Sequence, residues 1–282
     1  MDFNINIKVN NIENKTLKLL LKDLKDLTYM YLEETFKGNK VAFCYKDINN
    51  SFSISYNNSI CFYSASTIKI LACLMILKMA LDNKIDINDK VLIADKDIKQ
   101  GSGIIKYQKK NTYYSLKDLI KLTIVESDNT AYLKLVEILG KDNIKKYGNS
   151  LGAKYTMVGK ETDSFGIINT DDMLIYWQEV KRFIDENNKY SKELKEWLSN
   201  PSVKFISNAS IDNLNFVRKY GSCNIAYHEA GYIEDKNPFY LIVLTQLNKF
   251  EHKEKFINDT ANKILKLHRK IYKLKSGCNE IK

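Results

Sequence analysis

The order of strand-like and helical segments predicts an α+β fold. A helical pattern covers residues 15–36, and two strand-like runs follow at 40–48 and 51–57. Strand patterns return only late in the chain, as three runs over 216–247, and a long helical pattern begins near residue 250. We therefore expect both ends of the chain to build one five-stranded antiparallel sheet flanked by the terminal helices.

Hydrophobic spacing and turn residues support each element in turn. The stretch TLKLLLKDLKDLTYMYL repeats apolar residues at the spacing of one helix face, and two asparagines join the first two strand runs. Between Ser66 and about Asn200 the pattern is mostly helical. We expect a discontinuous α/β lobe from residues 1–60 and 208–282 and an all-helical lobe from 61–207. The active site is expected in the cleft between the two lobes.

Length and composition fit a globular protein with a sizeable core. The chain has 282 residues, of which 44% are hydrophobic, and only 11 glycines and two prolines. The net charge is +10, but the 44 basic residues interleave with 34 acidic ones along helical stretches, as on solvated helix faces. We therefore expect no nucleic-acid partner.

Cysteine and histidine placement argues against a metal centre. The five cysteines are odd in number and scattered, and none stands at zinc-ligand spacing from another or from the three histidines. We therefore expect no metal, no cofactor and a reducing compartment. The cysteines are Cys44, Cys61, Cys73, Cys223 and Cys278.

The N-terminal sequence bears on localisation. MDFNINIKVN has neither the basic nor the apolar region of a secretory signal, and the longest apolar run, ILACLMIL, is too short to span a bilayer. As written, the sequence predicts a cytoplasmic, monomeric chain without a membrane span. An extracellular or cell-envelope location is expected instead if a signal has been removed.

Ser66 and Lys69 stand three positions apart at the head of a helical run. Residues at this spacing share a helix face, so the hydroxyl and the amine can come within hydrogen-bond reach. A helix start offers free backbone N–H groups, and apolar surroundings favour the neutral, basic form of a lysine. The pattern predicts a nucleophile with its base. A helix-capping serine followed by a surface lysine would give the same sequence pattern, and this is the structural alternative.

Ser127-Asp128-Asn129 lies between two helical runs. Here Ser127 can shuttle a proton, Asp128 can brace the turn, and the Asn129 amide can hold a substrate carbonyl. Asp and Asn before a helix are also ordinary N-caps, which is the structural alternative.

Lys219-Tyr220-Gly221 lies in a strand-like run near the end of the chain. The cationic Lys219 can hold a substrate carboxylate, and Gly221 allows a close approach to the strand. The structural alternative is a lysine on an edge strand.

Together the three motifs resemble those of the penicillin-recognising serine hydrolases, and most closely those of class A β-lactamases. The similarity continues through GSGIIKY (101–107), residues 115–140, LGAKYT (151–156) and the closing PFYLIVLTQ, so it covers most of the chain. It implies a β-lactamase/transpeptidase-like fold. It also implies acyl transfer from a small substrate, either a β-lactam or an acyl-D-Ala-like peptide.

The resemblance also implies the site residues. Ser66 attacks the carbonyl, Lys69 activates it, and Ser127 passes the proton to the leaving nitrogen. Two backbone N–H groups, those of Ser66 and Ser222, hold the oxyanion. The implied catalytic residues are Ser66, Lys69 and Ser127, and the implied substrate-binding residues are Asn129, Lys219, Tyr220, Gly221 and Ser222.

The deacylation loop departs from the family pattern. Class A enzymes carry an E-x-x-L-N loop whose glutamate positions the deacylating water. Residues 159–173 lack it, although Glu161 and Asp163 are carboxylates near its place. Leu133 replaces the asparagine that braces that loop, and Tyr220 replaces the usual threonine. We therefore expect complete acylation and atypical deacylation. A slowly turning-over penicillin-binding protein, DD-peptidase or sensor stays open as an alternative, and a serine-dependent glutaminase ranks below it.

Two other signals are interpreted as structural. GNSLG matches the G-x-S-x-G elbow around Ser150, but a helical pattern precedes it, so we predict that Ser150 is a loop residue. His228 alternates into a strand and is predicted to be a structural histidine, with a position at the rim of the site as the alternative.

Overall fold

The computed structural model of the protein describes residues 3–7, 15–33, 39–49, 52–160 and 163–275. All structural statements below refer to these residues.

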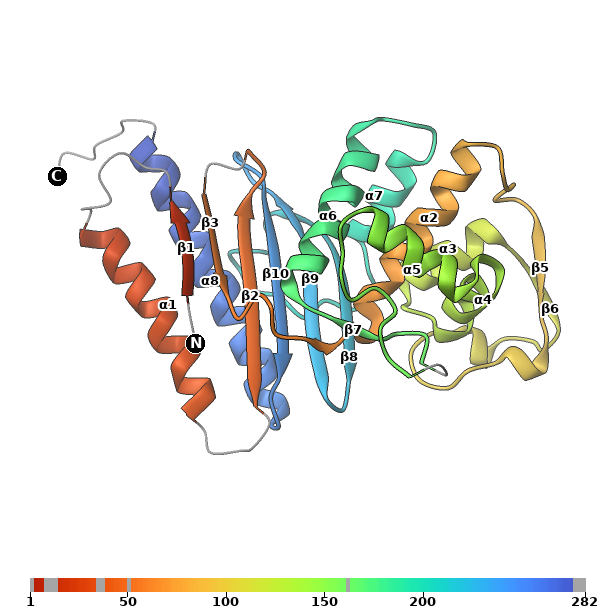
Figure 1. The fold of residues 1–282 in the computed structure, drawn as a ribbon, viewed down its shortest axis with the longest axis horizontal. Coiled ribbons are helices and arrows are strands. Elements are labelled where there is room, and N and C mark those ends of the chain that lie inside the picture. Colours follow the sequence, from red (N-terminus) through yellow and green to blue (C-terminus); the bar gives the residue numbers. More distant parts are fainter. Residues whose placement is uncertain (1–2, 8–14, 34–38, 50–51, 161–162, 276–282) are drawn as a thin grey trace.

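One sheet, built from strands of both ends of the chain, forms the centre of the molecule (Figure 1). Its strand order is β1-β3-β2-β10-β9-β8, and every neighbouring pair is antiparallel. The five predicted strands are present, and β1 adds a sixth at one edge, where no strand pattern was recognised. The strands are β1 (Phe3–Ile7), β2 (Lys40–Asp47), β3 (Phe52–Tyr56), β8 (Asn215–Cys223), β9 (Ala226–Glu234) and β10 (Phe239–Gln246).

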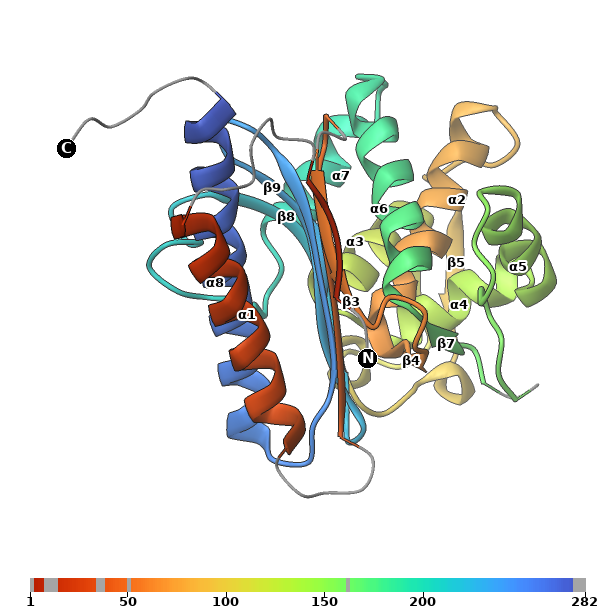
Figure 2. The same cartoon turned by 60° about the vertical axis from the view of Figure 1, so that its left-hand side comes forward.

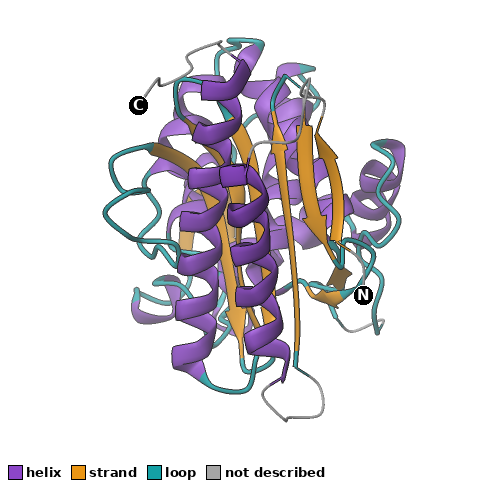
Figure 3. Cartoon of the chain, turned by 90° about the vertical axis from the view of Figure 1, so that its left-hand side faces the viewer, coloured by secondary structure: helices purple, strands orange, loops and turns teal. Residues whose placement is uncertain are grey.

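Two terminal helices, α1 (Lys15–Glu33) and α8 (Phe250–Lys275), cover one face of this sheet (Figures 2 and 3). Both carry an apolar stripe, because every third or fourth residue is hydrophobic. Leu24 of α1 and Ile264 of α8 are buried in a core shared with Phe43 of β2. The long-range pairing of β2 with β10 joins the two ends of the chain into one layer.

The opposite face of the sheet carries the middle of the chain (Figure 2). Its central helix, α2, is apolar nearly all round and is almost fully buried, as expected for a helix surrounded by others. The helices of this part are α2 (Lys69–Leu81), α3 (Leu116–Val125), α4 (Asn129–Leu139), α5 (Lys141–Ser150), α6 (Thr170–Asp185) and α7 (Ser191–Ser199).

This middle part is not wholly helical. Two short strand pairs interrupt it, β4 (Phe62–Tyr63) with β7 (Ile167–Ile168) and β5 (Lys90–Ile93) with β6 (Thr112–Ser115). Such pairs are too short to show a clear alternation in sequence. The hydrophobic cores lie on the two opposite sides of the sheet, and the boundaries of the two lobes stay a prediction.

No helix within the described ranges is long and apolar enough to cross a bilayer. The four cysteines that lie in these ranges are free thiols, and Cys278 lies outside them.

Candidate active site

Ser66 lies in a 3₁₀ turn, η1 (Ala65–Ile68), that leads directly into α2. Its side chain is almost fully buried, at 6% exposure. Ala65, just before it, has φ of +45°, a left-handed conformation that L-residues with a Cβ rarely adopt. Backbone strain of this kind persists only where the surroundings impose it, and it is concentrated at functional sites.

The turn that carries Ser66 is pressed against β8 at Gly221. A Cβ built on Gly221 lies 2.8 Å from the backbone nitrogens of both Ser66 and Thr67. Only glycine permits this approach. Since β8 is an edge strand of the sheet, the backbone groups on its outer side have no strand partner there and can pair with a ligand. Ser222, the next residue, is exposed at this edge.

Lys69 is fully buried and joins the first two motifs. Its Nζ donates to the backbone oxygen of Ser127 at 2.5 Å and to Asn129 Oδ1 at 2.8 Å, and it lies 3.4 Å from Ser127 Oγ. Two aromatic rings, those of Tyr132 and Phe165, flank the amine at 5.6 and 5.7 Å. The amine is therefore held by neutral acceptors and ring faces.

The environment of Lys69 favours its neutral form. Burial holds the pKa of Lys69 well below its usual value, and the positive charge of Lys219 lowers it further. Asp128 opposes this shift, but more weakly. A lysine that is neutral near physiological pH has a free lone pair and can accept a proton from a hydroxyl.

The Ser127-Asp128-Asn129 turn is built by its central carboxylate. Asp128 caps α4 through Ala131 N at 2.9 Å, and its second oxygen accepts from Ile104 N and Ile105 N at 2.7 and 2.8 Å. This confirms a bracing geometry, and it also makes Asp128 an ordinary N-cap. Ser127 has φ of +52° and is fully buried, so the brace holds it in a strained conformation.

Asn129 faces Lys69 from the start of α4. Its Oδ1 accepts from Lys69, and its Nδ2 donates to Gln100 O at 2.9 Å. A Cβ on Gly101 lies 2.7 Å from this Nδ2. The 101–107 loop therefore packs directly on the Asn129 amide and fixes its orientation.

Lys219 and Tyr220 complete the meeting of the three motifs. Lys219 is fully buried, and burial lowers its pKa to about 7, while Cys73 and Glu229 act in the opposite direction. Burial raises the pKa of Tyr220, and the side chains of Ser127 and Ser202 lower it by less. Tyr220 thus also carries a hydroxyl, as the threonine usual at this position does, but on a longer side chain.

The loop before α6 approaches Ser66 through backbone contacts. Ser64 donates from Oγ to Phe165 O at 2.6 Å and from its backbone N to Gly166 O at 3.0 Å. Asp163 accepts from the backbone of Phe165 and Gly166 at 2.9 and 3.2 Å. Its carboxylate also accepts from Tyr63 Oη of β4 at 3.4 Å, so it is engaged by its own turn and by the neighbouring strand. Glu161, the other predicted carboxylate, lies outside the described residues.

Aromatic residues are the part of this site that the sequence patterns missed. Tyr132 and Phe165 pack on each other at 5.2 Å beside Lys69, and Leu133 is packed against the helical core. No spacing rule singles out Phe165, because it stands in an irregular loop. Tyr132 falls in an ordinary helical pattern, which predicts only that it packs in the core.

The two structural signals resolve differently. His228 is fully buried, accepts from Thr245 N at 3.0 Å and lies 2.9 Å from Tyr63 O through Nε2, which is the geometry of a structural histidine. The loop assignment of Ser150 is wrong, because Ser150 is the last residue of α5. Its hydroxyl donates to Tyr147 O at 2.7 Å, as an ordinary helix-end serine does.

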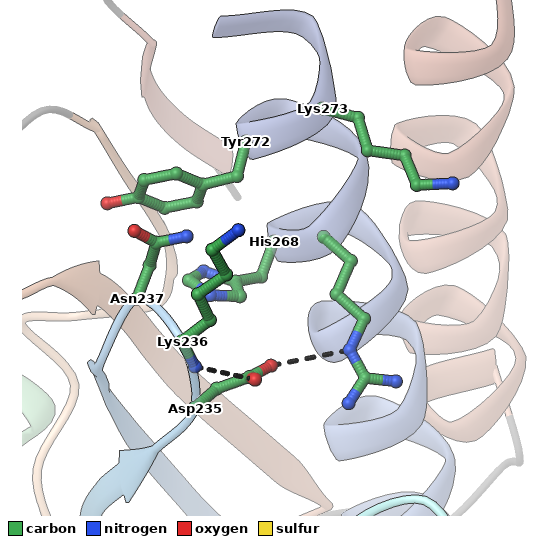
Figure 4. Close-up of a pocket in the computed structure, with 7 residues that line it drawn as sticks. Asp235, Lys236, Asn237, His268, Tyr272 and Lys273 are labelled. Carbon is green, nitrogen blue, oxygen red and sulfur yellow. Dashed lines mark hydrogen bonds and ion pairs between the residues drawn. The ribbon is translucent and has the colours of Figure 1, made fainter. Parts of the chain in front are cut away.

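A separate cavity of about 440 Å³, lined by none of the motif residues, lies between the β9–β10 turn and α8 (Figure 4). Its inner side chains are engaged in the fold: His268 Nδ1 lies 2.7 Å from Tyr45 Oη, and Tyr272 donates to Asp47 at 2.9 Å. The lining residues are Asp235, Lys236, Asn237, His268, Arg269, Tyr272 and Lys273.

Comparisons with solved structures confirm the predicted fold. A β-lactamase from Sphaerobacter thermophilus superposes with a TM-score of 0.76 at 19% identity, over 87% of this chain and 96% of that one. PBP-A superposes with a TM-score of 0.78 at 14% identity, over 91% and 97%. A mutant of PBP-A, solved as an acyl-enzyme complex with penicillin G, gives 0.77 at 15% identity, over 89% and 97%.

Sequence comparisons agree with the fold. β-Lactamase BRO-1 of Moraxella catarrhalis is 29% identical over 165 residues, which is 55% of this chain and 50% of that protein. The match thus spans half the length of this relative. The family described as the β-lactamase enzyme family matches residues 20–268, which include all three motifs. The chain therefore belongs to the β-lactamase enzyme family.

Proposed function

We propose that the protein is a serine acyl hydrolase that opens β-lactam amides through an acyl-enzyme on Ser66. The observation that carries this proposal is the environment of Lys69. Its amine is buried, has a lowered pKa and is hydrogen-bonded to both Ser127 and Asn129. Lys69 follows Ser66 by three residues in the sequence. A base with these properties is what a serine nucleophile needs.

The proposed acylation step follows from the contacts. Lys69 takes the proton of Ser66 as Oγ bonds to the lactam carbonyl carbon, and the carbon–nitrogen bond then breaks. Ser127, 3.4 Å from Lys69 Nζ, passes the proton to the leaving nitrogen. The oxyanion is placed at the backbone N–H groups of Ser66 and Ser222, at the junction of η1 and β8. Hydrolysis of the ester by water restores the Ser66 hydroxyl.

Substrate orientation is assigned to the two remaining groups of the site. The Asn129 amide, held by Lys69 and Gln100, can donate to or accept from a substrate amide. Lys219 supplies the cation for a substrate carboxylate, with Tyr220 and Gly221 beside it on β8. A carboxylate at Lys219 repays part of the desolvation that lowers its pKa.

A second candidate, a penicillin-binding protein with a long-lived acyl-enzyme, is favoured by the loop before α6. Phe165 places a ring 5.7 Å from Lys69 Nζ, and Asp163 spends its carboxylate on Phe165 N and Gly166 N. Within the described part of the loop, this leaves an apolar ring beside Lys69. A ring cannot activate the water that deacylation needs.

A time course of intact mass with benzylpenicillin, run beside Ser66→Ala, tests the proposal. We expect an adduct of one penicillin on the native protein and none on Ser66→Ala. Disappearance of the adduct with release of penicilloate identifies a β-lactamase, and a lasting adduct identifies the second candidate. If no β-lactam modifies Ser66, the proposal is wrong, and ammonia release from glutamine tests the remaining alternative.

A further inference from the structure

We infer that Phe205 and Tyr220 form an aromatic wall that selects substrates by the group attached to the leaving nitrogen. The preferred substrate carries a flat apolar or aromatic substituent there. This inference rests on the proposed function, because it concerns the same acyl transfer. It adds a specificity-determining residue, Phe205, that belongs to none of the three motifs.

Four rings from separate segments form one row that begins in the candidate site. Tyr220 packs on Phe205 at 5.0 Å, and Phe205 stacks on Tyr227 at 3.9 Å with only 10° between the ring planes. Tyr227 then meets Phe250 edge to face at 5.6 Å. Aromatic contacts of this kind prefer defined offset or edge-on geometries, so the row holds its shape.

The inner end of the row lies on the side of the leaving nitrogen. Tyr220 directly precedes Gly221, whose Cα packs against Ser66 N and Thr67 N, and the side chains of Ser127 and Ser202 lower the pKa of the Tyr220 hydroxyl. Ser127 is the group proposed to protonate the leaving nitrogen, so a substituent on that nitrogen points toward the Tyr220 side of the site. Phe205 is the next ring outward and is only half-buried, so a ring edge is free to contact a ligand.

The segment that carries Phe205 is held rigidly by polar contacts. Asn258 Nδ2 donates to Phe205 O at 2.8 Å. The next residue, Ile206, donates from N to Glu229 at 2.6 Å and accepts at O from Arg218 at 2.6 Å. A wall that is fixed before the substrate arrives loses little entropy on binding.

The ion pair behind the wall has a positioning role in this arrangement. Arg218 and Glu229 are almost fully buried and 3.5 Å apart. Arg218 Nε and Glu229 Oε1 have no hydrogen-bond partner among the described residues. A buried ion pair that lacks some of its hydrogen bonds contributes little to the free energy of folding, because desolvation offsets the attraction. Such a pair can instead fix one conformation of the backbone around it. Here the specified element is the 205–206 backbone.

The outer ring of the row, Phe250, is exposed, and Val203 and Ile225 are other exposed apolar residues of neighbouring segments. Val203, Ile225 and Phe250 are 42%, 53% and 58% exposed. Exposed apolar groups that adjoin a site are typical of ligand contacts. Ring contacts connect Phe250 to Tyr220, but Phe205 is the ring next to Tyr220 and is therefore the one that the substituent meets first.

The test compares two cephalosporins that share one nucleus and one acyl side chain. One carries a styryl group at C3 and the other a methyl group, and neither group is expelled on ring opening. The second-order rate of Ser66 acylation is measured by intact mass and stopped flow. We expect the styryl compound to react about tenfold faster with the native protein, in line with a well-packed aromatic contact. This preference should fall to about twofold in Phe205→Ala.

Matched variants separate the wall from general effects on folding. Phe205→Tyr keeps the ring and should keep the preference, whereas Phe205→Leu keeps most of the bulk and should lose it. Phe250→Ala removes the outermost ring and should change the preference less than about twofold. Comparing ratios between variants cancels the intrinsic reactivity of the two compounds.

The outcomes distinguish this inference from the proposed function. An unchanged preference in both Phe205→Ala and Phe205→Leu, or none in the native protein, overturns the wall while Ser66 is still acylated. Failure of both compounds to modify Ser66 overturns the proposed function instead. If Phe205→Ala is unfolded by circular dichroism, the Leu and Tyr variants decide the question.

Discussion

At the residue scale, the amines of Lys69 and Lys219 are both fully buried, and the positive charge of Lys219 lowers the pKa of Lys69. Lys69 is depressed by burial and then by Lys219, and Lys219 is depressed by burial to a pKa of about 7. When the surroundings push the pKa values of two titratable groups apart, one group can act as the base while the other stays charged. In the proposed mechanism, Lys69 is the neutral base, and Lys219 is the cation that binds a substrate carboxylate.

The pKa of Lys219 predicts a pH limb in acylation. Lys219 is cationic below about pH 7 and loses its charge above it. The acylation rate constant at low benzylpenicillin concentration should therefore fall as pH rises through 7, by up to about tenfold per pH unit. The methyl ester of benzylpenicillin has no carboxylate, so it should not show this limb. In Lys219→Arg, which stays charged, the limb should disappear; a limb that survives there assigns it to another group.

Gly221 predicts a second effect at the residue scale. In Gly221→Ala the new Cβ meets Ser66 N and Thr67 N at 2.8 Å, so η1 has to move away from β8. Acylation by benzylpenicillin should fall at least about 100-fold, the size of effect seen when one oxyanion donor is lost. Cys223→Ala is the control, because this exposed residue at the end of β8 has no assigned role and acylation should change less than about threefold. Equal losses in both variants would contradict the backbone contact.

At the scale of elements, we expect the loop between α5 and α6 to set the lifetime of the proposed acyl-enzyme. Hydrogen bonds from Ser64 hold it, and β7 pairs with β4 just before η1. The loop is therefore a fixed wall of the site, and the side chain it presents to Lys69 is the ring of Phe165.

Phe165→Glu should shorten the lifetime of the penicilloyl-enzyme at least about tenfold, because a carboxylate there can act as a general base for water. It should also slow acylation, since a negative charge near Lys69 raises its pKa. Phe165→Gln, which has nearly the same shape as Glu without its charge, should leave the lifetime unchanged. Both are measured by the decay of the adduct mass after excess penicillin is removed. Equal lifetimes in the two variants would show that the loop does not control deacylation.

At the scale of the whole molecule, two buried histidines couple stability to pH. His228 ties β9 to β4 and β10, and His268 ties α8 to β2 through Tyr45. Burial lowers the pKa of each to about 4. The unfolded chain binds their protons near pH 6.5, so between pH 6.5 and 4 it holds more protons than the fold. Stability is complete above pH 6.5 and falls as the pH drops toward 4.

Each histidine should contribute a loss of about 3 kcal/mol over that window. Urea unfolding at pH 7.0, 6.0 and 5.0 measures the loss. In His268→Gln the fold should be weaker at pH 7, but the slope of the unfolding free energy with pH should be about half that of the native protein. A native stability that does not change from pH 7 to 5 would contradict these assignments.

The sequence carried much of the fold and the site, and specific physical reasons limited the rest. The five main strands and the terminal helices follow from hydrophobic period, and the three motifs follow from residue spacing. The edge strand β1 was missed because five residues of alternating Phe, Asn and Ile are a weak signal. Phe165 and Phe205 were missed because they lie in irregular segments, where contacts arise from tertiary packing alone. The roles of the motif residues stay predictions.

The order of strands in the sheet has a consequence for the birth of the protein. Ser66 and α2 leave the ribosome early, whereas β8, against which Ser66 rests, is synthesised more than two thirds of the way along the chain. β2 then waits for β10, the last strand, before it has a neighbour on that side. Pairing across such long separations makes folding slow. The nascent protein therefore carries Ser66 without β8 beside it until more than two thirds of the chain has been synthesised. Under the proposed mechanism, a translation product truncated before β8 should be unable to undergo acylation.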